Sequence, residues 1–115
     1  MRKSKYFSTP SQASEFDREA GIRRDLAVKI KYHLEFYIGE FNSRETRQRV
    51  VASVGEVLSE HGGVRYFKVT CDEKLNPPHL IDDNKLLVEV YVIFNRLCHR
   101  IMFCAENFRV NWDKL

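Results

Sequence analysis

Cysteine and histidine lie close together near the C-terminal end of the chain, where they could suggest a metal site. Cys98 and His99 are adjacent, and Cys104 follows six residues later. Zinc needs ligands that converge on one point, usually including a Cys-x-x-Cys pair. Adjacent strand residues point to opposite faces, and six strand residues separate Cys98 from Cys104 by roughly 20 Å. We therefore predict no metal site, and the odd count of three, with Cys71, favours reduced, buried thiols.

Acidic residues gather in one polar segment and could suggest a calcium site. They are Asp72, Glu73, Asp82 and Asp83. Calcium loops of the EF-hand type need a twelve-residue spacing and a central glycine, which this segment lacks. We expect Asp72 and Asp82 to cap turns through backbone hydrogen bonds instead. Since no nucleophile motif and no phosphate-binding glycine loop is recognisable either, the sequence predicts no catalytic residue, no cofactor and no enzyme.

Two amphipathic helices are predicted in the first half of the chain. The first should run from Asp17 or Ile22 to Gly39, because apolar residues recur at four-residue steps. That stripe consists of Ile22, Leu26, Ile30, Leu34 and Ile38, and the outer face should be basic through Arg23, Arg24, Lys29 and Lys31. The second helix is predicted from about Arg44 to Glu60. Its predicted signals are a capping box of Asn42 and Glu45 and a glycine stop at 62–63.

Three strands are predicted in the second half, at 64–71, 86–94 and 97–104. Both faces of the middle strand are largely apolar, which predicts a central strand covered on each side. The connection at 95–96 is short enough for a hairpin, and a single helical turn is expected at 81–84. The expected fold is α+β, with two helices packed on a small antiparallel-rich, mixed sheet of three to four strands.

Each end of the chain is predicted to be an extended arm. Residues 17–104 would form the domain, with an N-terminal arm at 1–16 and a C-terminal arm or extra strand at 105–115. The first arm contains Tyr6 and Phe7, and it is either a docking segment or a disordered tail. The second contains Phe108, Val110 and Trp112 at a spacing of two, which is typical of a strand. That strand would either pair within the chain or be donated to another subunit.

Length and composition indicate one ordinary globular domain. The chain has 115 residues, of which 43% are hydrophobic and 30% charged. The formal charge of +3 permits an acidic partner without requiring nucleic acid. No apolar run approaches the ~20 residues of a membrane span, and the basic start is not followed by the apolar region of a secretory signal.

The order and spacing of residues from Val69 to Ile101 resemble the C-terminal domain of contractile phage tail sheath proteins. The matching positions are Val69, Cys71, Asp72, Asn76, Pro78, Ile81, Asp82, Asn84, Leu86, Tyr91, Val92, Arg96 and Ile101. The pair Arg23-Arg24 also resembles the double-basic helix start of that family. The chain departs from the family at Phe94-Asn95, where the family has Pro-Ala. A full sheath subunit is several times longer, so we expect a reduced, sheath-like protein that caps, initiates or substitutes for sheath, with a truncated piece as the alternative.

The resemblance implies a structural virion protein of a phage tail or related injection device, assembled in the host cytoplasm. Its expected partners are further copies of itself or tail sheath, tube or baseplate proteins, joined by strands exchanged through Tyr6, Phe7, Phe108, Val110 and Trp112. The basic helix face would contact an acidic inner tube. A structural loop is implied at Asp72, Asn76, Pro78, Asp82, Asn84 and Arg96. The alternative is a small non-enzymatic adaptor that binds protein or, as the less favoured ligand, nucleic acid.

Overall fold

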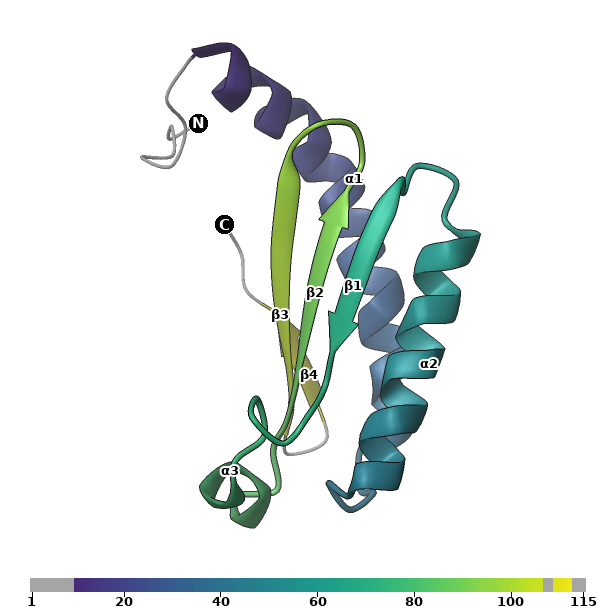
Figure 1. Cartoon of the computed structure of the whole chain (residues 1–115), viewed down its shortest axis with the longest axis vertical. Helices are drawn as coiled ribbons and strands as arrows, with labels where there is room; N and C mark the ends of the chain where they lie inside the picture. Colours follow the sequence, from purple (N-terminus) through teal and green to yellow (C-terminus); the bar gives the residue numbers. More distant parts are fainter. Residues whose placement is uncertain (1–9, 107–108, 113–115) are drawn as a thin grey trace.

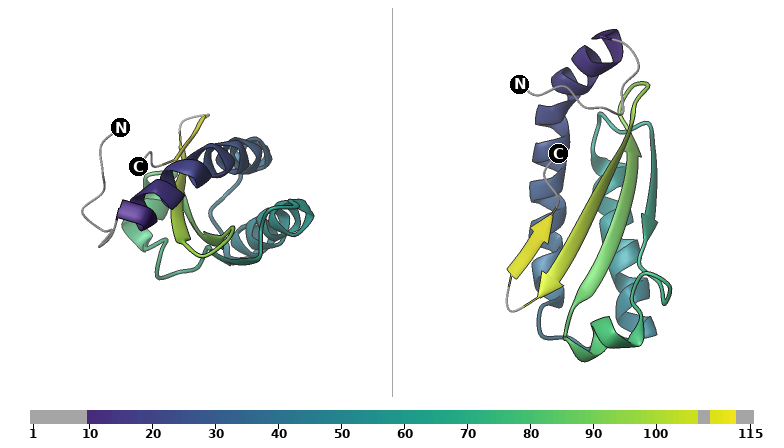
Figure 2. Two further views of the ribbon diagram at one scale, coloured as in Figure 1. Left: turned by 90° about the horizontal axis from the view of Figure 1, so that it is seen from above. Right: turned by 90° about the vertical axis from the view of Figure 1, so that its left-hand side faces the viewer.

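The computed structural model describes residues 10–106 and 109–112 of the chain. Two long helices cover one face of a four-stranded antiparallel sheet, whose strands follow the order β1-β2-β3-β4 (Figures 1 and 2). The elements are α1 (Pro10–Leu34), η1 (Glu35–Tyr37), α2 (Arg44–Glu60), β1 (Tyr66–Thr70), α3 (Pro78–Asp82), β2 (Leu86–Ile93), β3 (Cys98–Glu106) and β4 (Arg109–Trp112). The predicted α+β class is confirmed, and the paired strands are antiparallel throughout rather than mixed.

Helix α1 begins earlier than the apolar pattern predicted. Its first residue is Pro10, a position that tolerates proline because the first helical N–H needs no partner. Residues 10–16, predicted to lie in the N-terminal arm, are therefore helical. The helix ends at Leu34, earlier than the predicted end at Gly39, because η1 follows it; Gly39 then has a φ of 91°, a value that favours glycine.

The buried stripe of α1 continues into polar residues. Leu26, Ile30 and Leu34 are buried as predicted, but Ile22 is 40% exposed. Arg23, one turn before the buried Ala27, takes the buried position instead, because steps of four residues drift by about 40° per turn round an α-helix and carry Ile22 off the buried face. The same face continues toward the N-terminus at Glu19 and Glu15.

Helix α2 has the predicted limits but a different cap. The Ser43 hydroxyl accepts a hydrogen bond from the backbone N–H of Thr46 at 3.2 Å, so Ser43 is the N-cap and the predicted capping box of Asn42 and Glu45 is wrong. The helix ends at an extended His61, and of the described glycines only Gly39 has a positive φ. The glycine pair at 62–63 therefore follows the helix without the left-handed cap predicted for it.

Strand β2 is central, as predicted, but within the described residues helices cover only one of its faces. It pairs with β1 and β3, and Val88, Val90 and Val92 are buried beneath the helices. On the opposite face Tyr91 is exposed and Ile93 half-buried, because both long helices lie on the other side of the sheet (Figure 2). The predicted cover on both faces is therefore wrong for this chain.

Candidate interaction surfaces

The loop between β1 and β2 is held by the side chain of Asn76, which is 1% exposed. Its carboxamide donates to the carbonyl of Leu87 at 3.0 Å and accepts from the N–H of Leu87 at 2.8 Å. The same amide nitrogen also donates to the carbonyl of Asp72 at 3.0 Å. Asp72 in turn accepts from the N–H of Leu75 at 2.9 Å, which confirms the turn cap predicted for this aspartate.

Asn42, the residue predicted as a cap, joins this loop to α2 and β2. Its amide donates to the carbonyl of Lys85 at 2.8 Å and to the side-chain oxygen of Asn76 at 3.1 Å. Its own side-chain oxygen accepts from the guanidinium of Arg47 at 2.8 Å. Arg47 is buried although it is charged, and these bonds give its guanidinium polar partners within the fold.

The remaining predicted loop residues divide between two ends of the molecule. Pro78 is the first residue of α3, so the helical turn predicted at 81–84 begins earlier, and Asn84 after it has a φ of 58°. Pro78, Asp82 and Asn84 are exposed. Arg96 lies in the β2–β3 hairpin at the opposite end of the sheet from α3 (Figure 1), so the structure does not bring it to the loop.

Arg96 instead contacts the N-terminal part of α1. Its guanidinium donates to Glu15 at 3.3 Å, and the neighbouring Asn95 donates to the other carboxylate oxygen of Glu15 at 2.9 Å. The Glu15 side chain is 7% exposed and that of Arg96 is 76% exposed. Glu15 thus ties the hairpin to a helical segment that sequence reasoning assigned to an arm, and no apolar periodicity marks it.

A second polar cluster lies between α1 and β3. His99 Nε2 lies 3.2 Å from Glu19 Oε1, and the His99 ring lies 5.4 Å from that of Phe94. Burial lowers the pKa of His99, while Glu19 acts in the opposite direction and Arg23 in the same direction. The Arg23 guanidinium donates to the carbonyl of Arg100 at 2.8 Å.

This placement corrects the predicted basic face of α1. Arg23 is buried and binds β3, so it cannot contribute to an outer surface. Arg24 and Lys29 are exposed, and Lys31 is half-buried with its ammonium 5.9 Å from the ring centre of Tyr32. The other three predicted basic residues lie outside the core, but Lys29 is about 140° round the helix from Arg24, so they do not form a single face.

The cysteines are free, as predicted, but not uniformly buried. Cys71 is buried, Cys104 half-buried and Cys98 exposed, whereas the neighbouring His99 is buried. Cys98 and His99 thus point to opposite faces of β3. Burial raises the pKa of the Cys71 thiol to about 12. Across residues 10–106 and 109–112, no group of three or more His, Cys, Asp or Glu side chains could hold a metal ion.

The two edges of the described sheet are β1 and β4. In β1, Tyr66, Phe67 and Lys68 are exposed. In β4, Val110 is buried opposite Ala105 and Trp112 is half-buried, so this segment pairs with β3 of its own chain. The other predicted exchange residues, Tyr6, Phe7 and Phe108, lie outside the described residues.

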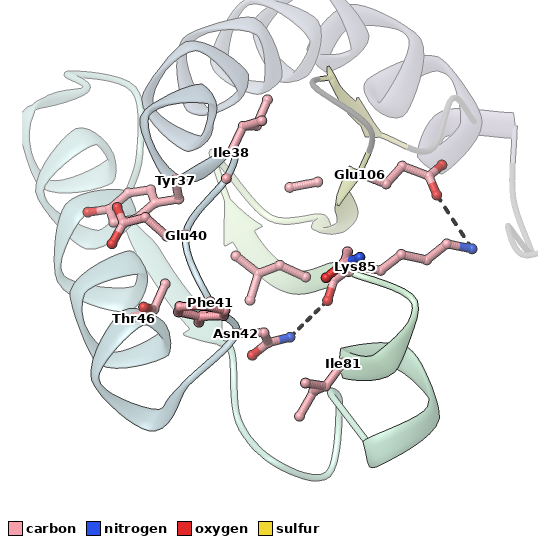
Figure 3. A pocket seen from close by; sticks show the side chains of 13 residues that line it. Tyr37, Ile38, Glu40, Phe41, Asn42, Thr46, Ile81, Lys85 and Glu106 are labelled. Atoms are coloured by element: carbon pink, nitrogen blue, oxygen red, sulfur yellow. Dashed lines mark hydrogen bonds and ion pairs between the residues drawn. The ribbon is translucent and has the colours of Figure 1, made fainter.

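A groove of about 390 Å³ lies at the end of the molecule that carries α3 (Figure 3). We call it the end groove, and its lining residues are Tyr37–Asn42, Thr46, Ile81, Asn84, Lys85, Leu86, Ala105 and Glu106. On its rim Phe41 is 90% exposed. Sequence reasoning missed this site, because it gathers three segments that are distant in the sequence.

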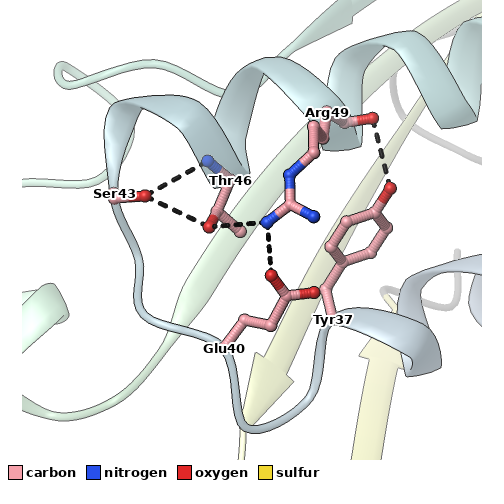
Figure 4. Close-up of polar contacts among 5 residues, drawn as sticks. All are labelled: Tyr37, Glu40, Ser43, Thr46 and Arg49. Carbon is pink, nitrogen blue, oxygen red and sulfur yellow. Dashed lines mark hydrogen bonds and ion pairs between the residues drawn. The ribbon is translucent and has the colours of Figure 1, made fainter.

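Polar contacts hold the α1–α2 connection that forms one wall of the end groove (Figure 4). The hydroxyl of Tyr37 donates to the carbonyl of Arg49 at 3.3 Å, and the guanidinium of Arg49 pairs with Glu40. On the opposite side, Lys85 pairs with Glu106 at 3.4 Å. These contacts give the groove defined walls while Phe41 stays exposed.

Within the described part of the chain, no helix is long and apolar enough to cross a membrane. The chain is similar to the tail sheath protein of Vibrio phage KVP40, with 36% identity over 103 residues. The match covers 84% of this chain but only 15% of that protein, so the chain spans a small part of its relative's length. No protein-family model and no solved structure matches the chain. The similarity is consistent with a partial sheath-like domain.

Proposed function

We propose that this chain is a sheath-like structural protein of a contractile phage tail, or of a related injection device, and that it resides in the virion tail. The observation that carries the proposal is the 36% identity to a tail sheath protein, which extends over 84% of the chain. An α+β domain with two edge strands suits such a role, because a polymer subunit needs surfaces that neighbours can extend.

The proposed contact between subunits is strand addition at the sheet edges. An edge strand presents unpaired backbone N–H and C=O groups, which an extended segment of another chain can pair with. Strand β1 suits the acceptor role, since it is an edge strand and its residues 66–68 are exposed. Either terminal segment of a neighbour would supply the added strand. Donation of β4 itself would require it to leave β3, where Val110 is buried.

The exposed basic side chains of α1 are proposed to contact an acidic partner such as the tail tube. Arg24 and Lys31, seven residues apart, share one face of the helix, where Arg24 is exposed and Lys31 is half-buried. Exposed charges of this kind contribute little to the stability of the chain itself, so their charge is available for steering and orienting a partner. Arg23 takes no part in this contact.

Immunogold electron microscopy tests the proposed function. Antibodies raised against this chain should label the tails of contractile particles isolated from its source, and the label should disappear when the antibody is first absorbed with purified chain. Labelling should extend along the tail if the chain replaces sheath, and should be confined to one end if it caps or initiates sheath. If purified particles contain no labelled chain and all of it is recovered apart from them, the chain is a separate adaptor.

A further inference from the structure

We propose that the end groove binds the Tyr6–Phe7 pair of a second copy of this chain. The proposal deepens the proposed self-association by naming one surface and one occupant for it. It differs from strand addition, because the contact is made by aromatic side chains in a groove at the α3 end rather than by backbone pairing at β1. Its test does not require a tail particle.

The groove has the size and the lining of a peptide side-chain pocket. Its volume of about 390 Å³ falls within the roughly 300–1,000 Å³ typical of small-ligand sites. Apolar atoms are supplied by Ile38, Ile81, Leu86 and Ala105. Phe41 extends over the rim with 90% of its surface exposed, so its ring is available to contact an incoming aromatic side chain.

The residues that precede α1 have the complementary composition. The segment Met1–Thr9 contains Tyr6 and Phe7 together with Arg2, Lys3 and Lys5, and it has no acidic residue. Burial of one aromatic side chain contributes roughly 1.5–3 kcal/mol.

Charged residues around the groove should make a smaller contribution to the affinity for the basic segment Met1–Thr9. Glu40 and Glu106 line it against a single lysine, Lys85, and Asp82 and Asp83 are exposed at the C-terminal end of α3. Both lining glutamates already have ion-pair partners, in Arg49 and Lys85, so most of the affinity must come from the aromatic rings.

The same chain cannot place these aromatics in its own groove. Helix α1 has 25 residues and is therefore about 37 Å long, and the lining of the groove begins at Tyr37, just beyond the end of this helix at Leu34. Phe7 is three residues before Pro10, a separation that an extended chain spans with at most about 11 Å. The occupant must therefore come from another molecule, and this holds wherever the polypeptide begins.

Such a contact is heterologous, since one copy contributes its N-terminal segment and the other its α3 end. Contacts of this kind close into a ring or continue as a filament, depending on the rotation between neighbours. Helix α3, which contributes Ile81 to the groove, and the start of α1 lie at opposite ends of the 44 Å long axis (Figure 2), which suits a head-to-tail arrangement.

Two variants of the full chain test the contributions of the groove and of the N-terminal segment independently. Phe41→Asp damages the groove and leaves the N-terminal segment intact, whereas the double substitution Tyr6→Ser, Phe7→Ser damages the segment and leaves the groove intact. Light scattering after size exclusion should show that the unchanged chain self-associates and that each variant alone does not. An equimolar mixture of the two variants should form a heterodimer, because one intact segment and one intact groove remain. Tyr32→Asp, at an exposed aromatic of α1 outside the groove, should associate like the unchanged chain.

A labelled peptide of sequence MRKSKYFST gives a second measurement. It should bind the Tyr6→Ser, Phe7→Ser variant, and Phe41→Asp should weaken its binding to the chain by about 10- to 100-fold, the equivalent of one buried aromatic ring. The proposal is overturned if Phe41→Asp still self-associates and binds the peptide equally well, or if the mixture fails to form a heterodimer while both variants are folded by circular dichroism. If these measurements support the groove contact but the chain is absent from tail particles, the proposed tail function is overturned and the groove contact stands.

Discussion

The side chain of Asn76 pairs with both backbone polar groups of Leu87, accepting from its N–H at 2.8 Å and donating to its C=O at 3.0 Å. The pairing between β1 and β2 ends at Thr70 and Glu89. Leu87 lies in β2 just outside this paired region, so no residue of β1 lies opposite it. A carboxamide has the same donor and acceptor as a peptide group, so Asn76 replaces one residue of a neighbouring strand. The loop is therefore fixed to the sheet by one buried side chain.

Replacing Asn76 should lower the free energy of unfolding by about 2–4 kcal/mol, because loss of a partner costs ~1–3 kcal/mol for each buried polar group. Asn76→Ala removes both bonds to Leu87. Asn76→Asp should be about as harmful, since a carboxylate cannot donate to the two carbonyls that the amide contacts. Urea unfolding measures the effect, with Asn111→Ala, at an exposed position of β4, as the matched control. A loss of less than 1 kcal/mol in Asn76→Ala would show that the loop is held by other contacts.

The sequence predicted what local periodicity and spacing determine. The limits of α2, the three strands and the hairpin follow from apolar repeats, and the family resemblance placed Asn76 in a structural loop. The bond from Asn76 to Leu87 joins segments eleven residues apart across a turn whose path local patterns do not specify. The aromatic-rich segments at both ends were recognised, but whether they pair within or between chains depends on tertiary contacts that local patterns do not specify.

Polar residues on buried faces were the main source of error. Apolar periodicity predicted an outer position for Arg23 and gave no signal for the burial of Glu15 and Glu19. These charged side chains are buried because β3 and the hairpin supply bonding partners for them, including the carbonyl of Arg100 and the amide of Asn95. The end groove was beyond prediction for a similar reason, since its walls are brought together only by the completed sheet.

Glu15 should matter more to stability than the arginine with which it pairs. Glu15→Ala removes a buried acceptor that serves both Asn95 and Arg96, and should cost about 1–2 kcal/mol. Arg96→Ala should cost less than about 1 kcal/mol, because its side chain is largely exposed and such ion pairs contribute little. Thermal or urea unfolding of both variants shows which substitution lowers the free energy of unfolding more. Equal losses, or a larger loss for Arg96→Ala, would contradict the anchoring role assigned to Glu15.

The three cysteines should react with a thiol reagent in the order of their accessibility. Cys98 is exposed and should react first in the native protein, followed by the half-buried Cys104, whose pKa is raised by burial. Cys71 should stay protected at pH 8, because it is buried and its pKa of about 12 keeps the thiolate scarce. Mass spectrometry after timed alkylation identifies each site, and denaturant should make all three react. Early modification of Cys71 in the native protein would contradict the burial of this end of β1.

The buried position of His99 predicts that the chain loses stability as the pH falls below about 6.5. Burial lowers the pKa of His99 in the folded chain, so below its ordinary value of about 6.5 the unfolded chain binds a proton that the folded chain resists. The free energy of unfolding should therefore decrease from pH 7 toward pH 5, and this contribution should be constant above pH 7. Glu19 and Arg23 face the ring from α1, and they act on the pKa of His99 in opposite directions.

The His99→Gln variant should be less stable at pH 7 by about 1–3 kcal/mol, because the contact with Glu19 is altered inside the core. Its free energy of unfolding should nevertheless change less between pH 7 and pH 5 than that of the unchanged chain. His79→Gln is the matched control, since His79 is exposed at α3 and its loss should leave the pH dependence intact. An equal slope in the unchanged chain and in His99→Gln would show that carboxylates, and not the buried imidazole, set the acid sensitivity of this fold.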